Sequence, residues 1–414
     1  MKKTVDLTMI VFISLSLLSG YLFLMFLVSS PLQSPFYSAG FSLVLMGIVV
    51  LGYRSFKNWW RLVAIPLFLL SFITGYLIGT AIFLQPITRE ELPPLEIPAS
   101  KQSDGFTAVI YFTHGEPPTY DKAIPAWKHS IQEMDESGAP FIPYPFRPFF
   151  FNAVRTEFLE AGGSHHNAIH NRMMMKLEQM MRSNYPNLRF YISFIDDRPH
   201  PNEAAWQAVK AGANKVVLTH VFLTESSHTL EGEEMIEELN LEANGIEVCT
   251  TYPLWNSDTL VEMFVDQAEQ MRHNLPADEV GILLVAHGQP PQWDQIYPKQ
   301  TQQETDFRQA IRDRLVQSGY LADNISLAWM EYRDPTPQDG LQKLLQQNVR
   351  LILVFSSSIS AEGIHSAYEI PEMLNEVSLP EGVRLVNLGA WNDHPLVLQA
   401  IAERIESCLD KHNQ

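Results

Sequence analysis

Three side chains that can bind a metal ion follow three separate apolar stretches in the second half of the 414-residue chain. Imidazole and carboxylate groups bind divalent cations less tightly than thiolates do, and both can accept protons. The carboxyl ends of neighbouring parallel strands line one edge of a sheet. We therefore predict that the three side chains form a metal-binding and catalytic site together. They are His287, Glu331 and His365, which follow the stretches 280–285, 326–330 and 351–355 in that order.

Each of these residues also has a purely structural explanation. A histidine at the start of a loop can cap a helix or bond a carbonyl group, and a glutamate at a strand end is usually exposed to water. The set carries more weight than any one member, because three strand ends of one sheet would bring all three side chains to the same edge. The sequence leaves open whether Glu331 binds the metal or accepts a proton.

The order of strand, histidine and helix occurs twice along the chain. The stretches 107–112 and 280–285 both run into a His-Gly pair, at His114 and at His287, with a proline two residues after each glycine. Short apolar strands that alternate with helical stretches are typical of βαβ units on a parallel sheet. We predict an α/β fold of two Rossmann-like lobes, related by internal duplication, that face each other across a cleft.

The first half lacks clear counterparts of Glu331 and His365. A second histidine, His228, precedes an acidic helical stretch, but that stretch has no Ile-Pro pair like the one at Ile370-Pro371. We therefore expect a single site in the second half, and we expect His114→Ala to leave most of the activity intact.

The second half resembles the small sirohydrochlorin cobaltochelatases. Residues 285–288 (VAHG) are similar to their first-strand motif, and Glu331 precedes a proline as their central glutamate does. Residues 363–371 (GIHSAYEIP) resemble their GxHxxxDIP motif, with Glu369 in place of the aspartate. In that family the two histidines and the glutamate are linked to metal binding and proton removal. The resemblance implies these roles for His287, Glu331 and His365.

Most of residues 105–405 also resemble ferrochelatase. Residues 286–290 (AHGQP) are similar to the segment that carries the family's active-site histidine, and residues 158–166 and 194–203 are similar to two further motifs. Several positions depart from the family. His365 replaces its catalytic glutamate, Met330-Glu331 stands where it has Gln-Ser, and His165 follows Ser164 where it has proline. The resemblance implies a class II metal chelatase that inserts Fe²⁺ or Co²⁺, as a substrate, into a tetrapyrrole such as a porphyrin or sirohydrochlorin, with no organic cofactor. The alternative is a non-catalytic carrier of haem, another tetrapyrrole or metal on the same fold.

Three uncharged apolar runs precede the α/β part, at residues 7–28, 36–53 and 62–84. Each is close to the roughly 20 residues that cross a bilayer as a helix. A cleaved signal peptide is the alternative for the first run, but the residues that follow it make a poor cleavage site. Basic residues flank the spans on alternate sides, which predicts a multi-pass protein of the inner or plasma membrane whose large domain lies outside the cytoplasm. The expected organisation is an anchor (1–88), a linker (89–104), a first lobe (105–275) and a second lobe with the metal site (276–414).

The net charge of the chain is −18, and all but five of its basic residues and all but one of its acidic residues follow residue 88. So acidic a domain repels nucleic acid, which is therefore not an expected partner. The oligomeric state does not follow from the sequence. The two cysteines, Cys249 and Cys408, form no CxxC motif, which argues against a cysteine-based zinc or redox site and leaves their pairing undecided.

A cluster of histidines, His165, His166 and His170, lies at the start of a probable helix in the first half. His166 and His170 share one helix face, so a metal-access site is one interpretation. Polar residues in contact with solvent are the more common explanation for such a cluster.

Overall fold

The structure is a computed structural model that describes residues 2–55, 59–86, 92–93, 105–138 and 142–410. The chain forms two compact units. The first comprises residues 1–89 and 119–162, and the second residues 90–118 and 163–414. Most of the expected linker, 89–104, lies outside the described residues, and the limits expected for the anchor and the two lobes remain predictions.

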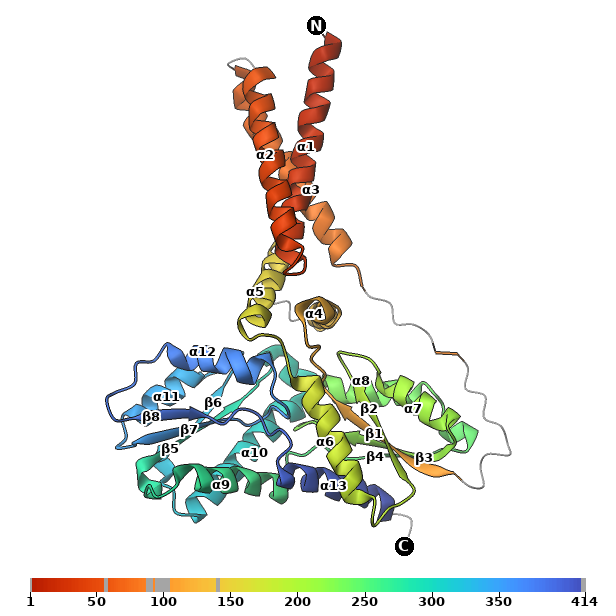
Figure 1. The fold of residues 1–414 in the computed structure, drawn as a ribbon, viewed down its shortest axis with the longest axis vertical. Coiled ribbons are helices and arrows are strands. Elements are labelled where there is room, and N and C mark those ends of the chain that lie inside the picture. Colours follow the sequence, from red (N-terminus) through yellow and green to blue (C-terminus); the bar gives the residue numbers. More distant parts are fainter. Residues whose placement is uncertain (1, 56–58, 87–91, 94–104, 139–141, 411–414) are drawn as a thin grey trace. The chain divides into compact units, whose positions relative to one another are not determined.

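Three long apolar helices begin the first unit (Figure 1): α1 (Lys2–Val28), α2 (Ser34–Ser55) and α3 (Trp59–Phe83). Their segments Leu7–Val28, Ser34–Arg54 and Val63–Phe83 are long and apolar enough to cross a membrane. The three predicted apolar spans are thus helical, with ends within a few residues of those expected.

Glycines bring the backbones of α1 and α3 close together. A Cβ atom added at Gly20 would lie 2.0 Å from the backbone oxygen of Phe72, and one at Gly75 would lie 2.1 Å from that of Leu17. Small residues permit such close approach between helices, which strengthens van der Waals packing in a lipid environment.

Three further elements belong to the first unit: α4 (Tyr120–Glu136), the short η2 (Tyr144–Phe146) and α5 (Arg147–Glu160). The Arg155 guanidinium donates to the backbone oxygens of Phe26 (2.7 Å) and Ser29 (3.0 Å) at the end of α1. The Tyr76 hydroxyl in α3 donates to the backbone oxygen of Pro145 (2.6 Å). The aromatic segment around α5 is therefore attached to the apolar helices by specific polar contacts.

The second unit contains two parallel four-stranded sheets of the same topology, with strand orders β2-β1-β3-β4 and β6-β5-β7-β8. This arrangement confirms the predicted duplicated α/β fold (Figure 1). The first sheet consists of β1 (Phe106–Thr113), β2 (Leu188–Phe194), β3 (Ala213–His220) and β4 (Glu247–Thr250). The second consists of β5 (Val280–Ala286), β6 (Ile325–Trp329), β7 (Leu351–Ser356) and β8 (Arg384–Asn387).

Helices connect the strands in both lobes. The longer ones are α6 (His166–Met181), α7 (Pro201–Lys210), α8 (Ser227–Glu237), α9 (Asp258–Arg272), α10 (Pro298–Gln317), α11 (Pro337–Leu345), α12 (Ile370–Asn375) and α13 (Pro395–Asp410). The short ones are η3 (Glu242–Asn244), η4 (Ala277–Glu279), η5 (Pro291–Gln295), η6 (Ala322–Asn324) and the π-helical turn η7 (His365–Glu369).

Alternating strand residues build the core of the second unit. In β1, Ile110 and Phe112 pack with residues of α7 and α8, whereas Val109 and Tyr111 face the opposite way. The strand β5 repeats this pattern, since successive side chains point to opposite faces of a sheet. One face of each sheet contributes to a common apolar cluster with α6, α9, α10 and α13. The two lobes are therefore joined by a shared hydrophobic core.

The last helix of the chain, α13, packs against the first lobe. It follows β8 of the second sheet, yet it contacts α6, β3 and α9. A disulfide joins Cys408 in α13 to Cys249 in β4, 159 residues earlier. The Lys215 ammonium group also donates to the backbone oxygen of Cys408 (3.1 Å). The cysteine pairing that the sequence left undecided thus ties the end of the second lobe to the edge of the first sheet.

Candidate functional site

His287 begins the loop that follows β5. Its backbone N–H donates to the Ser358 hydroxyl (2.7 Å), and its Nδ1 lies 2.8 Å from the carbonyl oxygen of Gly288. A carbonyl can only accept, so Nδ1 carries the proton in this contact and the neutral ring keeps its lone pair on Nε2. Gly288 has φ +90°, and a Cβ atom there would lie 2.6 Å from the backbone oxygen of Glu331. Glycine is therefore required where the ends of β5 and β6 converge.

His365 lies in the π-helical turn η7, next to His287. The two ring centroids are 5.1 Å apart with the rings edge to face, and Nδ1 of His365 is 2.8 Å from Oε2 of Glu369. Burial alone would lower the pKa of His365, but the charge and hydrogen bond of Glu369, with the charges of Glu331 and Glu116, raise it to about 10. Burial opposes ionisation of Glu369, yet the contact with His365 lowers its pKa. At neutral pH the two residues therefore form an ion pair.

Glu331 follows β6 and completes the predicted set. Its backbone N–H donates to the backbone oxygen of His287 (3.1 Å), and its carboxylate helps to raise the pKa of His365. The neighbouring Tyr332 has a positive φ of 62°, an uncommon conformation for a bulky residue. Burial and the adjacent Glu331 carboxylate raise the pKa of the Tyr332 phenol. The structure thus brings His287, Glu331 and His365 to one edge of the second sheet.

A second cluster occupies the same edge of the first sheet. His114 follows β1, Asp196 follows β2, and His228 lies in the first turn of α8. Nδ1 of His114 is 3.2 Å from Oδ2 of Asp196, and the ring centroids of His114 and His228 are 4.9 Å apart. Ligand atoms from all three lie within 4.8 Å of one another. Among the described residues, His114, Asp196 and His228 form the group of histidine and acidic side chains whose ligand atoms lie this close together. The ligand atoms of His287, Glu331 and His365 do not meet this spacing.

The expectation of a single site rested on the lack of clear counterparts of Glu331 and His365 in the first lobe, and it stays a prediction. Asp196 occupies the position after β2 that Glu331 occupies after β6. It stands in the sequence Ile195-Asp196-Asp197, where nothing distinguishes the first aspartate from the second before the fold is known.

The pKa values of His114, His166 and His170 in the first lobe are lowered. Half of the His114 side chain is exposed to solvent, and the protein partly desolvates its ring. This desolvation lowers the pKa of His114 well below its usual value, and the nearby His228 and His166 lower it further. Burial also lowers the pKa of His166, and that of His170 strongly. His114, His166 and His170 are therefore neutral imidazoles at pH 7.

The solvent-exposed interpretation of the histidine cluster holds for His165 and is wrong for its neighbours. His166 is 5% exposed and His170 is fully buried. The two nitrogens of His170 lie 2.9 Å from the Tyr111 hydroxyl and 3.1 Å from the Ser360 hydroxyl. Both ring nitrogens of His170 are thus engaged in the core, and this residue is structural.

Glu116 connects the two clusters. Its Oε1 accepts a hydrogen bond from the backbone N–H of Ile364 (2.9 Å), next to His365. Its charge acts on His166 in the first lobe and on His365 in the second. The electrostatic effect of His287 also lowers the pKa of His114. The two sets of histidines and carboxylates are therefore close enough to influence each other electrostatically.

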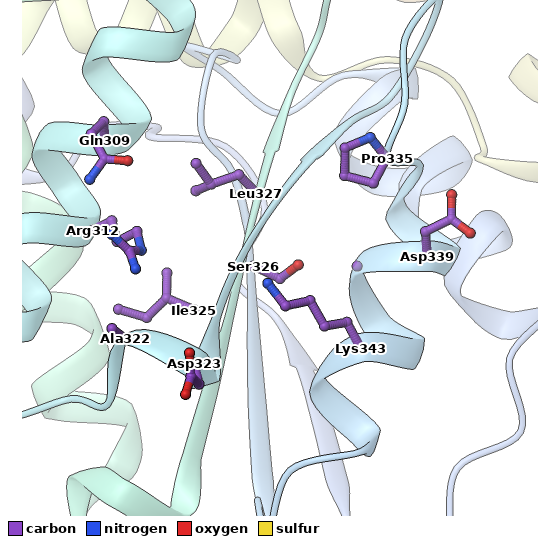
Figure 2. A pocket seen from close by; sticks show the side chains of 11 residues that line it. Gln309, Arg312, Ala322, Asp323, Ile325, Ser326, Leu327, Pro335, Asp339 and Lys343 are labelled. Atoms are coloured by element: carbon purple, nitrogen blue, oxygen red, sulfur yellow. The ribbon is translucent and has the colours of Figure 1, made fainter.

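A pocket of about 320 Å³ lies away from both clusters (Figure 2). It borders the edge strand β6, between residues of α10 such as Arg312 and residues of α11 such as Lys343. Its lining includes none of the clustered histidines, so we do not assign it to the site.

The sequence and fold belong to a known family of proteins. Residues 141–409 match the family model for ferrochelatase, and the chain belongs to the ferrochelatase family of chelatases. Ferrochelatases from Synechococcus elongatus and from Synechococcus sp. are each 23% identical to the chain over 260 residues, which are 60% of this chain and 67% of theirs.

Solved structures with a similar arrangement of elements include SirB from Bacillus subtilis with Fe³⁺. It is 13% identical, with a TM-score of 0.49, over 75% of this chain and 98% of that one. The sirohydrochlorin chelatase SirB from Bacillus subtilis subspecies spizizenii in complex with cobalt is 10% identical, with a TM-score of 0.44, over 74% and 97% of the two chains. Similarity at this level says nothing about the ligands of the present chain.

Proposed function

We propose that this protein is a membrane-anchored chelatase that inserts a divalent metal ion, Fe²⁺ or Co²⁺, into a tetrapyrrole such as a porphyrin or sirohydrochlorin. The observation that carries the proposal is the placement of His287, Glu331 and His365 at one sheet edge. Membership of the ferrochelatase family supports the same class of reaction. The metal ion is a substrate and has to be bound reversibly.

The side chains of the second lobe suit the two requirements of metal insertion. The ion needs exchangeable ligands, and Nε2 of His287 is available because Nδ1 is bonded to Gly288. Glu369 accepts from Nδ1 of His365, the contact by which a carboxylate commonly orients a metal-binding histidine. The ring must also lose two pyrrole protons. Glu331 and the Glu369–His365 pair are the groups that can receive and pass them on.

The test is metal insertion by the full-length protein in detergent. Fe²⁺ or Co²⁺ is supplied under anaerobic conditions with protoporphyrin, coproporphyrin or sirohydrochlorin, and the loss of free-base absorption is followed. We expect a rate above that of metal and ring alone. Both His287→Ala and Glu331→Gln should lower kcat by roughly 100-fold or more, since they remove a ligand and a charged proton acceptor. Glu381→Gln, in an exposed loop, is the matched control and should retain the wild-type rate.

The second candidate is a non-catalytic carrier of a tetrapyrrole or metal. The Cys249–Cys408 disulfide favours it, because disulfides persist in oxidising compartments and tetrapyrrole assembly is normally internal to the cell. A protein that binds ring and metal tightly, yet raises the insertion rate with none of the three rings, would support the carrier and overturn the chelatase.

A further inference from the structure

We propose that the first lobe holds a second divalent metal site, formed by His114, Asp196 and His228. It takes a borderline first-row cation such as Co²⁺, Fe²⁺ or Zn²⁺, for which imidazole nitrogen and carboxylate oxygen are suitable ligands. This inference does not depend on the proposed function, because a metal can bind in the first lobe whether or not the protein inserts metals.

The spacing of the three side chains suits a metal ion. In a tetrahedral site with bonds of about 2.1 Å, ligand atoms lie roughly 3.4 Å apart. Each of the three residues offers one ligand atom, and these atoms lie within 4.8 Å of one another.

The first pair of equivalent residues, His114 and His287, has the same local structure in both lobes. Each follows the strand that lies between two others in its sheet, β1 or β5. Each precedes a glycine with positive φ, +94° at Gly115 and +90° at Gly288. Nδ1 of each histidine contacts the carbonyl oxygen of that glycine, at 3.1 Å and 2.8 Å. The two imidazoles are therefore presented in the same way.

The other two positions are equivalent as well. The backbone N–H of Asp196 donates to the carbonyl oxygen of His114 (3.0 Å), as that of Glu331 donates to the carbonyl oxygen of His287 (3.1 Å). His228 lies in the first turn of the helix after β3, and His365 begins the helical turn after β7. The duplication has thus kept a complete set of two histidines and a carboxylate in the first lobe.

The polarity of the cluster supports a cation as its occupant. The Asp196 side chain is 4% exposed, and a carboxylate so buried is stabilised by a positive charge or a metal. Nδ1 of His228 is buried and, among the described residues, lacks a hydrogen-bond partner. The half-exposed His114 leaves a path for the ion. A divalent ion would stabilise the buried Asp196 carboxylate and provide a partner for Nδ1 of His228.

The experiment counts Co²⁺ ions bound to untagged full-length protein in detergent, by equilibrium dialysis, and follows the visible absorption of bound Co²⁺. We expect two ions per chain in the wild type. Asp196→Asn keeps the size of the side chain and should leave one ion, as should His114→Ala. A variant with both His287→Ala and His365→Ala should also leave one. Asp258→Asn removes a carboxylate that is 94% exposed and should leave two.

The experiment tests the second metal site separately from the proposed chelatase site. If Asp196→Asn and His114→Ala bind as much Co²⁺ as the wild type, with unchanged affinity, the second site is overturned while the proposed chelatase site stands. If the His287 and His365 replacements change nothing but the first-lobe variants each lose an ion, the second site stands and the proposed function loses its metal ligands. A wild type that binds no ion overturns both. His114 is half exposed, so its alanine variant decides the question even if Asp196→Asn does not fold.

Discussion

The contact between His365 and Glu369 determines how the second-lobe site responds to pH. Glu369 is four residues after His365 in the π-helical turn, and both side chains are largely buried. A histidine whose pKa is raised to about 10 carries a proton at neutral pH, and this proton must leave before the ring can bind a metal through Nε2. The usual pKa of histidine is about 6.5, so His365 titrates well above the usual range of its residue type.

We predict that Glu369→Gln lowers the free energy of unfolding by roughly 1.5–3 kcal/mol near neutral pH, because it removes a charge-assisted hydrogen bond. Because the pKa of His365 is raised, its contribution to the free energy of unfolding is complete below about pH 6.5. This contribution is lost as the pH rises through about 10. The lowered pKa of Glu369 makes its contribution complete above about pH 4.5, with loss below that value. Thermal melting of both proteins from pH 4 to 10 measures this difference. A difference that stays constant over the range would contradict the ion pair.

The residues that end long apolar strands could be predicted from the sequence, and those that depend on tertiary contacts could not. His287 and Glu331 follow strands whose continuous apolar character is visible in the sequence. Glu369 was recognised as a motif position, but its bond to His365 depends on the π-helical turn. Asp196 and Glu116 were missed because acidic residues in loops are common, and the contacts that distinguish them come from other parts of the chain.

At the scale of secondary-structure elements, the contact between α1 and α3 gives the sharpest prediction. We expect Gly20→Ala and Gly75→Ala each to destabilise the first unit by roughly 1–3 kcal/mol, because the new methyl group meets a backbone oxygen at about 2 Å and the helices must separate. Thermal unfolding of the full chain in detergent measures the effect. Gly47→Ala in α2 is the matched control, since a Cβ atom there has no neighbour within 4 Å. Equal melting of all three variants would show that the close packing does not stabilise the protein.

Hydrophobic patterning predicted the strands and the apolar helices, but it did not reveal which elements cluster together. The alternation in β1 follows directly from its sequence, because both faces of that strand are buried. By contrast, α4 and α5 cluster with the first unit, although they follow β1 in the chain. Their attachment depends on single hydrogen bonds, such as the one from Arg155 to the backbone oxygen of Phe26. The hydrophobic periodicity of a sequence does not predict such contacts.

At the scale of the whole molecule, the disulfide is expected to contribute strongly to stability. It closes a loop of 159 residues, and restricting so long a loop in the unfolded chain stabilises the folded state by about 2–5 kcal/mol. A variant with both Cys249→Ala and Cys408→Ala should melt at lower temperature than the oxidised wild type. Reductant should lower the melting temperature of the wild type and leave that of the variant unchanged. A wild type insensitive to reductant would contradict this role.

The membrane orientation expected from the basic residues stays a prediction, and it would place the disulfide outside the cytoplasm, where such bonds persist. Five basic residues lie at the ends of the apolar runs that are expected to face the cytoplasm: Lys2, Lys3, Arg54, Lys57 and Arg61. We predict that a reporter active only in the cytoplasm is silent when fused after Gln414, and that a reporter active only outside the cytoplasm is functional there. The opposite result would place the disulfide in a reducing compartment, where such bonds are rare.

The position of α13 has a consequence for how the protein is made. The core of the first sheet includes residues of α13, such as Val397 and Ile401, and its edge is held through Cys408. The lobe that is synthesised first therefore stays incomplete until nearly all of the second has been synthesised, and contacts so distant in sequence form slowly. A growing chain that stops before residue 395 keeps an uncovered apolar face and an unpaired thiol at Cys249. We expect chaperones and proteases to recognise such truncated chains, so that the contact that stabilises finished molecules also distinguishes them from unfinished ones.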